Sequence, residues 1–204
     1  KEDVNLIICH IGSGASIAAV KEGKGYDTTM GLTPLDGLMM GTRSGAIDPS
    51  IIEYVCKEAN MDVSEVTNAL NKKSGFLGIA GVSDCRDVEN EMANGNELAT
   101  LAYKMYNDRI AKYIAEYYIE LEGKVDDIIF TAGVGENGKE VREYVLNKLS
   151  PLGIKLDKEK NDSIASYREI HEGIITTDDS KIEVKVIPTD EVIMIVKDTY
   201  NFIK

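Results

Sequence analysis

The chain begins with an apolar run, residues 4–9 (VNLIIC), that leads directly into a histidine and a glycine turn, His10-Ile11-Gly12-Ser13-Gly14. A short apolar run followed by glycine is typical of a buried strand that ends in a tight turn. Glycine lets the backbone approach a ligand closely, and successive N–H groups in such a turn form a concavity that binds anions. The sequence therefore predicts a strand whose end presents backbone amides and one imidazole to a phosphate group.

His10 has two interpretations. At the end of the strand, its ring is placed to donate a hydrogen bond to a phosphoryl oxygen held by the amides of Gly12 and Gly14. The alternative is a core histidine that bonds a neighbouring carbonyl. A hydrolase nucleophile is excluded at Ser13, because a nucleophile elbow has glycine two residues before and after the serine, where this chain has isoleucine and alanine.

Composition narrows the class of ligand. With 204 residues, of which 43% are hydrophobic and 28% charged, the chain is long enough to bury a core as one or two globular domains. It has 23 Lys and Arg against 35 Asp and Glu, a net charge of −12. Because non-specific binding to nucleic acid depends on many cationic groups, we expect no nucleic-acid partner. A phosphate ligand must instead be held locally by a few well-placed groups.

The three cysteines, Cys9, Cys56 and Cys85, are odd in number and form no CxxC pair. This pattern argues against a disulfide framework and a structural zinc site, so the expected location is cytoplasmic. No apolar run is long enough to span a membrane and no signal peptide opens the chain, so we expect no membrane partner. The first residue is Lys1 rather than methionine, which suggests a fragment of a longer protein.

Hydrophobic periodicity, glycine turns and capping residues predict the order of elements. Three strands at residues 4–9, 15–20 and 25–30 form a meander. The remaining expected elements are helices at 49–58, 64–72, 96–121, 136–149 and 190–202, and strands at 125–131 and 182–187. The stretch 153–178 is expected to be irregular, with its charged residues on a solvated face.

The longest predicted helix, residues 96–121, carries apolar residues at three- and four-residue spacing and should pack against the core. The residues expected to face the core are Leu98, Leu101, Ala102, Met105, Ile110, Tyr113, Ile114, Tyr117 and Leu121.

The element order is β-β-β-α-β-α-β-α with a helical insertion. It predicts an α/β fold with a mixed sheet flanked by helices, and it resembles one half of the actin-like ATPase (ribonuclease H-like) superfamily. Since many folds share such elements, the order alone does not determine function.

Arg43 lies in a second glycine-rich loop, Gly41-Thr42-Arg43-Ser44-Gly45, before a predicted helix that Asp48 caps and that has Pro49 at its first position. There its guanidinium can bind two phosphoryl oxygens at once. The alternative is a surface arginine paired with Asp48.

A third glycine turn, Thr131-Ala132-Gly133-Val134-Gly135-Glu136-Asn137, follows a predicted strand and opens a helix. In this layout a nucleotide can pack against the backbone. The segment Asp84-Cys85-Arg86-Asp87 either lines the same pocket or is a capped helix start. Asp190 and Glu191, just after a strand, are candidates for a metal site, or for the cap and first turn of the last helix.

Taken together, these segments resemble the carboxy-terminal half of the acetate kinases. The matching motifs are His-Ile-Gly-Ser-Gly-Ala-Ser at 10–16, Asp-Thr-Thr-Met-Gly-Leu-Thr-Pro-Leu-Asp-Gly at 27–37, Met-Gly-Thr-Arg-Ser-Gly at 40–45, Ile-Asp-Pro at 47–49, Gly-Val-Gly-Glu-Asn at 133–137 and Pro-Thr-Asp-Glu at 188–191. The resemblance implies transfer of the ATP γ-phosphoryl group to acetate, which gives acetyl phosphate and ADP, with Mg²⁺ as cofactor.

On matching positions, the resemblance implies that His10 and Arg43 are catalytic and stabilise the transferring phosphoryl group. Glu191 belongs to the metal site. The residues expected to bind the nucleotide are Gly12, Ser13, Gly14, Asp84, Cys85, Arg86, Gly133, Val134, Gly135, Asn137 and Val141.

Three departures from the family pattern accompany these matches. Ser13 stands where the family usually has asparagine. The usual Pro-Thr-Asn-Glu-Glu is Pro-Thr-Asp-Glu-Val here, so one of two glutamates remains, with Asp190 as a substitute. The segment 81–87 is one residue shorter than the usual form.

The resemblance also implies that residues 1–204 are a single nucleotide-binding domain and that an amino-terminal domain with further catalytic residues is missing. The fragment alone is then expected to bind nucleotide without turnover, and a homodimer is expected. Propionate or butyrate kinase is an alternative, because the carboxylate pocket lies mostly upstream. A non-catalytic nucleotide-binding or interaction module is a third possibility.

Overall fold

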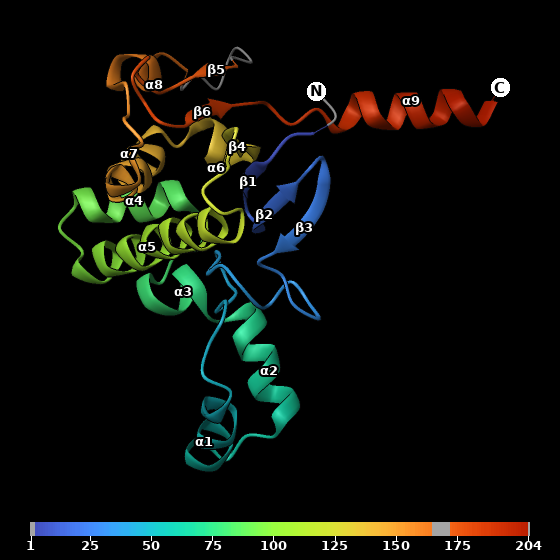
Figure 1. The fold of residues 1–204 in the computed structure, drawn as a ribbon. Coiled ribbons are helices and arrows are strands. Elements are labelled where there is room, and N and C mark those ends of the chain that lie inside the picture. The colour runs from blue at the N-terminus through green and yellow to red at the C-terminus, as the bar shows by residue number, and fades with distance from the viewer. Residues whose placement is uncertain (1–2, 165–171, 204) are drawn as a thin grey trace.

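A computed structural model describes residues 3–164 and 172–203 and shows a six-stranded sheet with the order β3-β2-β1-β4-β6-β5 (Figure 1). The first three strands form the expected antiparallel meander. Strand β4 pairs parallel with β1, β6 pairs parallel with β4, and β5 pairs antiparallel with β6. The predicted mixed α/β sheet is confirmed. The strands are β1 (Leu6–Ile11), β2 (Ala15–Lys21), β3 (Lys24–Thr28), β4 (Asp127–Thr131), β5 (Gly173–Ile174) and β6 (Glu183–Val186).

The first strand begins and ends two residues later than predicted. Its last two residues, His10 and Ile11, pair with Ser16 and Ala15 in the hairpin to β2. Cross-strand pairing therefore extends the strand beyond the apolar run. Side chains alternate along β1, so Ile11 is buried while His10 points to solvent.

Between β3 and β4 the chain inserts five helices, and helices also follow each of the later parallel strands. The long helix α5 contacts β1 and β2, and it packs against α3, α4 and α7 (Figure 1). The helices are α1 (Ser50–Ala59), α2 (Val63–Lys72), α3 (Gly75–Ala80), α4 (Cys85–Ala93), α5 (Glu97–Glu120), α6 (Ala132–Asn137), α7 (Lys139–Lys148), the 3₁₀ turn η1 (Ser150–Leu152), α8 (Lys158–Ile164) and α9 (Glu191–Ile203).

Helix starts follow local capping chemistry. Asp48 Oδ1 accepts the Ser50 N–H at 2.9 Å and Pro49 already has helical dihedral angles, as expected for a capped start with proline at the first position. Asn96 caps α5 by accepting the N–H groups of Leu98 and Ala99. Both caps join residues within one turn of each other, and the Asp48 cap was predicted from the sequence whereas the Asn96 cap was not.

The prediction of which face of α5 is buried was partly wrong. Leu98, Leu101 and Met105 are exposed, at 56%, 47% and 45% of their maximum. The first half of the helix buries Ala102, as predicted, and also Ala99 and two tyrosines, which were not predicted. Because α3 and α4 pack on this half, and because alanines let a neighbouring helix approach closely, packing selects a face that apolar periodicity alone does not identify.

Two further expectations need correction. The turn after β4 was expected to be a loop with a helix from Glu136, but β4 runs directly into the short helix α6, and α7 begins after Gly138. Ala132, at φ +64°, makes the sharp change of direction between strand and helix. The stretch expected to be irregular contains α8 and β5, while its residues 165–171 lie outside the described part of the chain.

The last helix, α9, extends away from the sheet (Figure 1). Its apolar side chains at residues 192–196 are all exposed. Among the described residues, no helix combines the length and the apolar character that a membrane span needs.

The buried face of α5 can be tested with a pair of truncations. Ile110→Ala should lower the free energy of unfolding by about 2–5 kcal/mol, because Ile110 is fully buried and its loss leaves a cavity. Met105→Ala should change it by only about 0.5 kcal/mol, because Met105 is half exposed. Urea denaturation measures both, and equal losses would contradict the assignment of the two faces.

Candidate functional site

Two adjoining cavities lie where β1 and β4 end. The first encloses about 820 Å³ and the second about 1170 Å³, and they share Gly12, Ser13 and Gly133. The first is bordered by the start of α4, by α6 and the start of α7, and by Phe76 and Tyr106. A cleft of this size suits a nucleotide-sized ligand.

The first cavity unites two segments that are far apart in the chain. Asp84, Cys85 and Arg86 line one part of it, and Gly133, Val134 and Asn137 line another. Other lining residues were not predicted: Gly41, Thr42, Phe76, Ser83, Glu89, Tyr106, Gly138, Lys139 and Glu140. Helix spacing offered a signal only for Glu89, which lies one turn after Cys85 on α4.

Both interpretations of Asp84 hold. Asp84 Oδ1 accepts the Arg86 N–H at 2.9 Å, which caps α4, and the Arg86 guanidinium also binds both carboxylate oxygens at 2.8 and 3.0 Å. These bonds hold the pKa of Asp84 below its usual range. The capped helix start is therefore also part of the cavity wall.

The glycines of the wall differ in the space around them. A Cβ at Gly133 would meet nothing within 4 Å, whereas a Cβ at Gly41 would lie 2.6 Å from the Ser83 carbonyl oxygen. Gly41 thus lets two lining loops touch, and Gly133 leaves the cavity open. Gly135 and Val141 are buried and line neither cavity.

His10 and Gly14 line the second cavity. His10 is exposed, so the alternative of a buried core histidine is wrong. The Gly12 N–H donates to the Gly14 carbonyl at 3.1 Å. The Gly12 amide is thus engaged within the turn, contrary to the expectation that both glycine amides face a ligand.

Arg43 lies next to the same glycine turn. Its Nη1 would be 4.0 Å from a Cβ at Gly14, and it also contacts Met40 Sδ at 3.4 Å. Within the described part of the chain, no ion pair joins Arg43 to Asp48, so the alternative of a surface pair is not supported. Gly75 holds this loop in place, because a Cβ there would lie 2.0 Å from the Met40 carbonyl oxygen.

The loop before α9 is tied to the start of α6. Thr189 Oγ1 accepts the Ala132 N–H at 3.2 Å and lies 2.7 Å from Thr131 Oγ1. The Thr189 N–H donates to Glu136 Oε1 at 2.8 Å. These bonds, between residues distant in sequence, fix one wall of the second cavity.

Asp190 lines the second cavity and also caps α9, since its Oδ1 accepts the Ile193 N–H at 2.9 Å. Glu191 begins α9, but its side chain lies outside the described part of the structure. Among the side chains that the structure describes, no group of three or more His, Cys, Asp or Glu is arranged to hold a metal ion.

The first cavity has an acidic side. Burial raises the pKa of the Glu89 carboxyl above its usual range, and the nearby Glu140 raises it further. Burial also raises the pKa of the Cys85 thiol to about 12. Cys85 is therefore a neutral part of the wall at physiological pH, and Glu89 is destabilised when it is charged.

This architecture defines a class. A mixed sheet of the actin-like ATPase type has a glycine turn at the end of β1 and the glycine-containing helix α6 at the end of the neighbouring parallel strand β4, and a cavity for a nucleotide-sized ligand lies between them. The chain belongs to the acetokinase family, whose family model matches residues 1–197.

Curated relatives are about half identical to this chain over the residues that match. The acetate kinase of Finegoldia magna is 49% identical over 205 residues, and that of Thermoanaerobacterium thermosaccharolyticum is 52% identical over 205 residues. Both matches cover 100% of this chain and 50% of the relative. The chain therefore spans about half the length of the curated relatives it matches.

Solved structures of an acetate kinase and a propionate kinase superpose closely on this chain. The Porphyromonas gingivalis acetate kinase superposes with a TM-score of 0.92 at 43% identity and covers 100% of this chain and 50% of its own. A propionate kinase from Francisella tularensis superposes with a TM-score of 0.89 at 44% identity, over 97% of this chain and 49% of its own.

The charge on Glu89 can be tested by Glu89→Gln. The pKa of Glu89 is higher in the folded state than in the unfolded chain, where it is about 4.3. The free energy of unfolding therefore falls as pH rises from the unfolded-state pKa through the higher folded-state pKa. The variant should therefore have a Tm higher than wild type by about 1–4 °C at pH 7. The difference should vanish below about pH 4.

The exposed Glu58→Gln is the matched control, because it removes the same charge from the surface and should raise the Tm at pH 7 less than Glu89→Gln does. Thermal unfolding followed by circular dichroism across this pH range measures both variants. A lower Tm for Glu89→Gln at pH 7 would contradict the assignment.

Proposed function

We propose that this chain forms the nucleotide-binding half of an acetate kinase, a phosphotransferase that moves the γ-phosphoryl group of ATP to acetate. The observation that carries the proposal is the first cavity, which joins the turn at Gly12 and Ser13 to the wall at residues 84–86 and to α6. Membership of the acetokinase family supports the same assignment.

In this proposal the nucleoside lies between Asp84–Arg86 and α6, and the phosphates extend along the glycine turn into the second cavity. The exposed ring of His10 and the guanidinium of Arg43 flank that turn. Phosphoryl transfer depends on positioning and on positive charge around the transferring group. His10 would hold a phosphoryl oxygen as hydrogen-bond donor, and Arg43 would neutralise developing charge.

The reaction needs little proton chemistry from this half. A carboxylate oxygen of acetate forms a bond to the γ-phosphorus as the bond from that phosphorus to the β–γ bridging oxygen breaks. The products are acetyl phosphate and ADP. Since acetate is already ionised at neutral pH, no general base is required.

The residues beside the second cavity fit Mg²⁺, which proteins usually hold with one or two carboxylates together with substrate phosphates. Asp190 supplies a carboxylate at this edge, and we propose Glu191 as the second. When bound, the ion would neutralise charge on the phosphate oxygens.

The remaining catalytic groups and the acetate pocket are proposed to lie in the other half, because this chain covers half the length of its relatives. Residues 1–204 then form one nucleotide-binding domain that requires this partner half for turnover. The homodimer stays a prediction, open to a sedimentation measurement.

A test of the cavity is calorimetric titration of Mg·ADP and Mg·ATP into the 204-residue chain. Gly133→Val should abolish binding of both nucleotides, because its side chain enters the cavity without a clash in the fold. Arg43→Ala should weaken the binding of ATP by about tenfold and the binding of ADP by less, since the arginine is proposed to contact the γ-phosphoryl group.

Gly25→Val is the matched control, because a Cβ at Gly25 also meets nothing within 4 Å and Gly25 lines neither cavity. It should bind both nucleotides like wild type. Absence of nucleotide binding by the wild-type chain would contradict the proposal and would favour the non-catalytic interaction module.

A second candidate is a propionate kinase, favoured by the similarity to the Francisella tularensis enzyme. The two functions differ by one methylene in the acceptor, which a hydrophobic pocket discriminates by about 10–200-fold. We expect kcat/KM in the complete enzyme to be at least about tenfold higher for acetate than for propionate. The reverse order would make the protein a propionate kinase.

A further inference from the structure

Arg142 is a fully buried cation on α7, behind the cavity wall. Its Nη1 donates to the carbonyl oxygens of Gly135 at 2.8 Å and Glu136 at 2.7 Å. Its Nε donates to Asn161 Oδ1 at 2.7 Å, and its Nη2 to the Asn161 carbonyl at 3.2 Å. The guanidinium therefore connects the last turn of α6 to α8.

These partners are unusual for a buried charge. Among residues 3–164 and 172–203, no carboxylate forms an ion pair with Arg142, although buried cations are normally paired. Burial lowers the pKa of Arg142 to about 10, so the side chain still carries its charge at neutral pH. The carbonyl groups of Gly135 and Glu136, at the negative end of the α6 dipole, partly compensate the charge.

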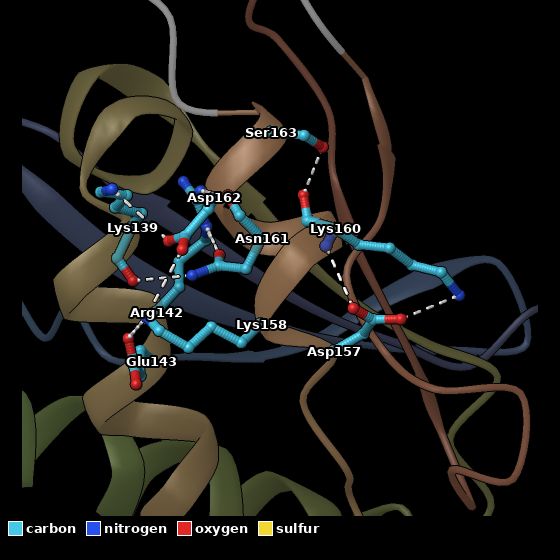
Figure 2. Close-up of polar contacts among 9 residues, drawn as sticks. All are labelled: Lys139, Arg142, Glu143, Asp157, Lys158, Lys160, Asn161, Asp162 and Ser163. Atoms are coloured by element: carbon cyan, nitrogen blue, oxygen red, sulfur yellow. Dashed lines mark hydrogen bonds and ion pairs between the residues drawn. The ribbon is translucent and has the colours of Figure 1, made fainter.

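Asn161 sets the direction of this guanidinium. It is fully buried on α8, and its Nδ2 donates to the Lys139 carbonyl at 3.0 Å while its Oδ1 accepts from Arg142 (Figure 2). Around this pair, Lys158 Nζ lies 2.7 Å from Glu143 Oε2 and Lys139 Nζ lies 3.5 Å from Asp162 Oδ1, and these two ion pairs join α8 to α7 (Figure 2). The arginine is thus fixed from both sides.

Helix α6 is therefore held at both ends. At its start, Thr189 binds the Ala132 N–H, and at its end Arg142 binds two carbonyl groups. Between these ends lie Gly133 and Val134, which line the first cavity. A helix of only six residues has few internal hydrogen bonds and is only weakly stable by itself. Contacts with the rest of the protein therefore determine the position of α6 in the cavity wall.

We propose that Arg142, oriented by Asn161, is a positioning residue for the nucleotide: it holds α6 where Gly133, Val134 and Asn137 form the cavity wall. The inference rests on the proposed function only for the identity of the ligand. Displacements of about 1 Å in such a wall cost up to about 100-fold in function.

The test compares Arg142→Met with Lys160→Met in the 204-residue chain. Lys160 is the matched control, because it binds Asp157, Asp178 and the Thr176 carbonyl on the side of α8 that faces away from α6. Figure 2 shows that side chain pointing away from Arg142. Hydrogen exchange of the α6 amides and titration of Mg·ADP are measured for both variants.

We expect Arg142→Met to speed exchange in α6 by at least about tenfold relative to β1, and to weaken Mg·ADP binding by about tenfold. Lys160→Met should change exchange in α6 no more than in β1 and should leave binding within about twofold of wild type. Arg142→Lys, which retains the charge and part of the bonding, should recover part of the binding. If Arg142→Met fails to fold, Asn161→Leu removes the orienting contact and should show the same pattern in milder form.

Equal acceleration of exchange in α6 and β1 would overturn the inference, because it would mean that Arg142 only stabilises the fold. Unchanged Mg·ADP binding despite faster exchange in α6 would also overturn it. If wild type itself does not bind Mg·ADP, the proposed function fails, and the exchange comparison alone then decides whether Arg142 positions α6.

Discussion

The parallel pairing of β1 with β4 is the contact on which the site depends. Its register places Cys9 opposite Phe130 and His10 opposite Thr131, so both strands end at the same edge of the sheet. Beyond that edge, each strand leads into a glycine-containing segment, the turn at residues 12–14 and helix α6. A ligand at this edge meets backbone from both strands, as is general for parallel sheets.

The inserted helices complete the cavity. Helix α5 crosses β1 and β2 and supports α3, α4 and α7, so the start of α4 faces the start of α7 across the first cavity. Asp84 and Arg86 contribute because α4 is held on α5, and Lys139 and Glu140 contribute because α7 is held on the same helix. The cavity therefore forms because α3, α4 and α7 all pack on α5.

Charge is distributed to suit an anion in an acidic chain. The net charge is −12, yet the edge where the phosphates are proposed to lie carries His10 and Arg43. Glu89, whose pKa is raised by burial, lines the first cavity but not the second. Local placement of a few donors thus overcomes an unfavourable overall charge, since screening limits distant charges to about 8–10 Å in salt.

The sequence by itself determined the strands of the meander, the capped starts of α1 and α4, and the three glycine segments, because neighbouring residues make those bonds and turns. It did not determine the whole buried face of α5, since the packing of α3 and α4 buries Ala99 and leaves Leu98 exposed. It also offered no signal for Arg142, whose partners come from α6 and α8. Local hydrogen bonds and periodicity involve residues that are close in the sequence. The cavity and its supports instead arise from contacts between distant segments that only the folded chain brings together.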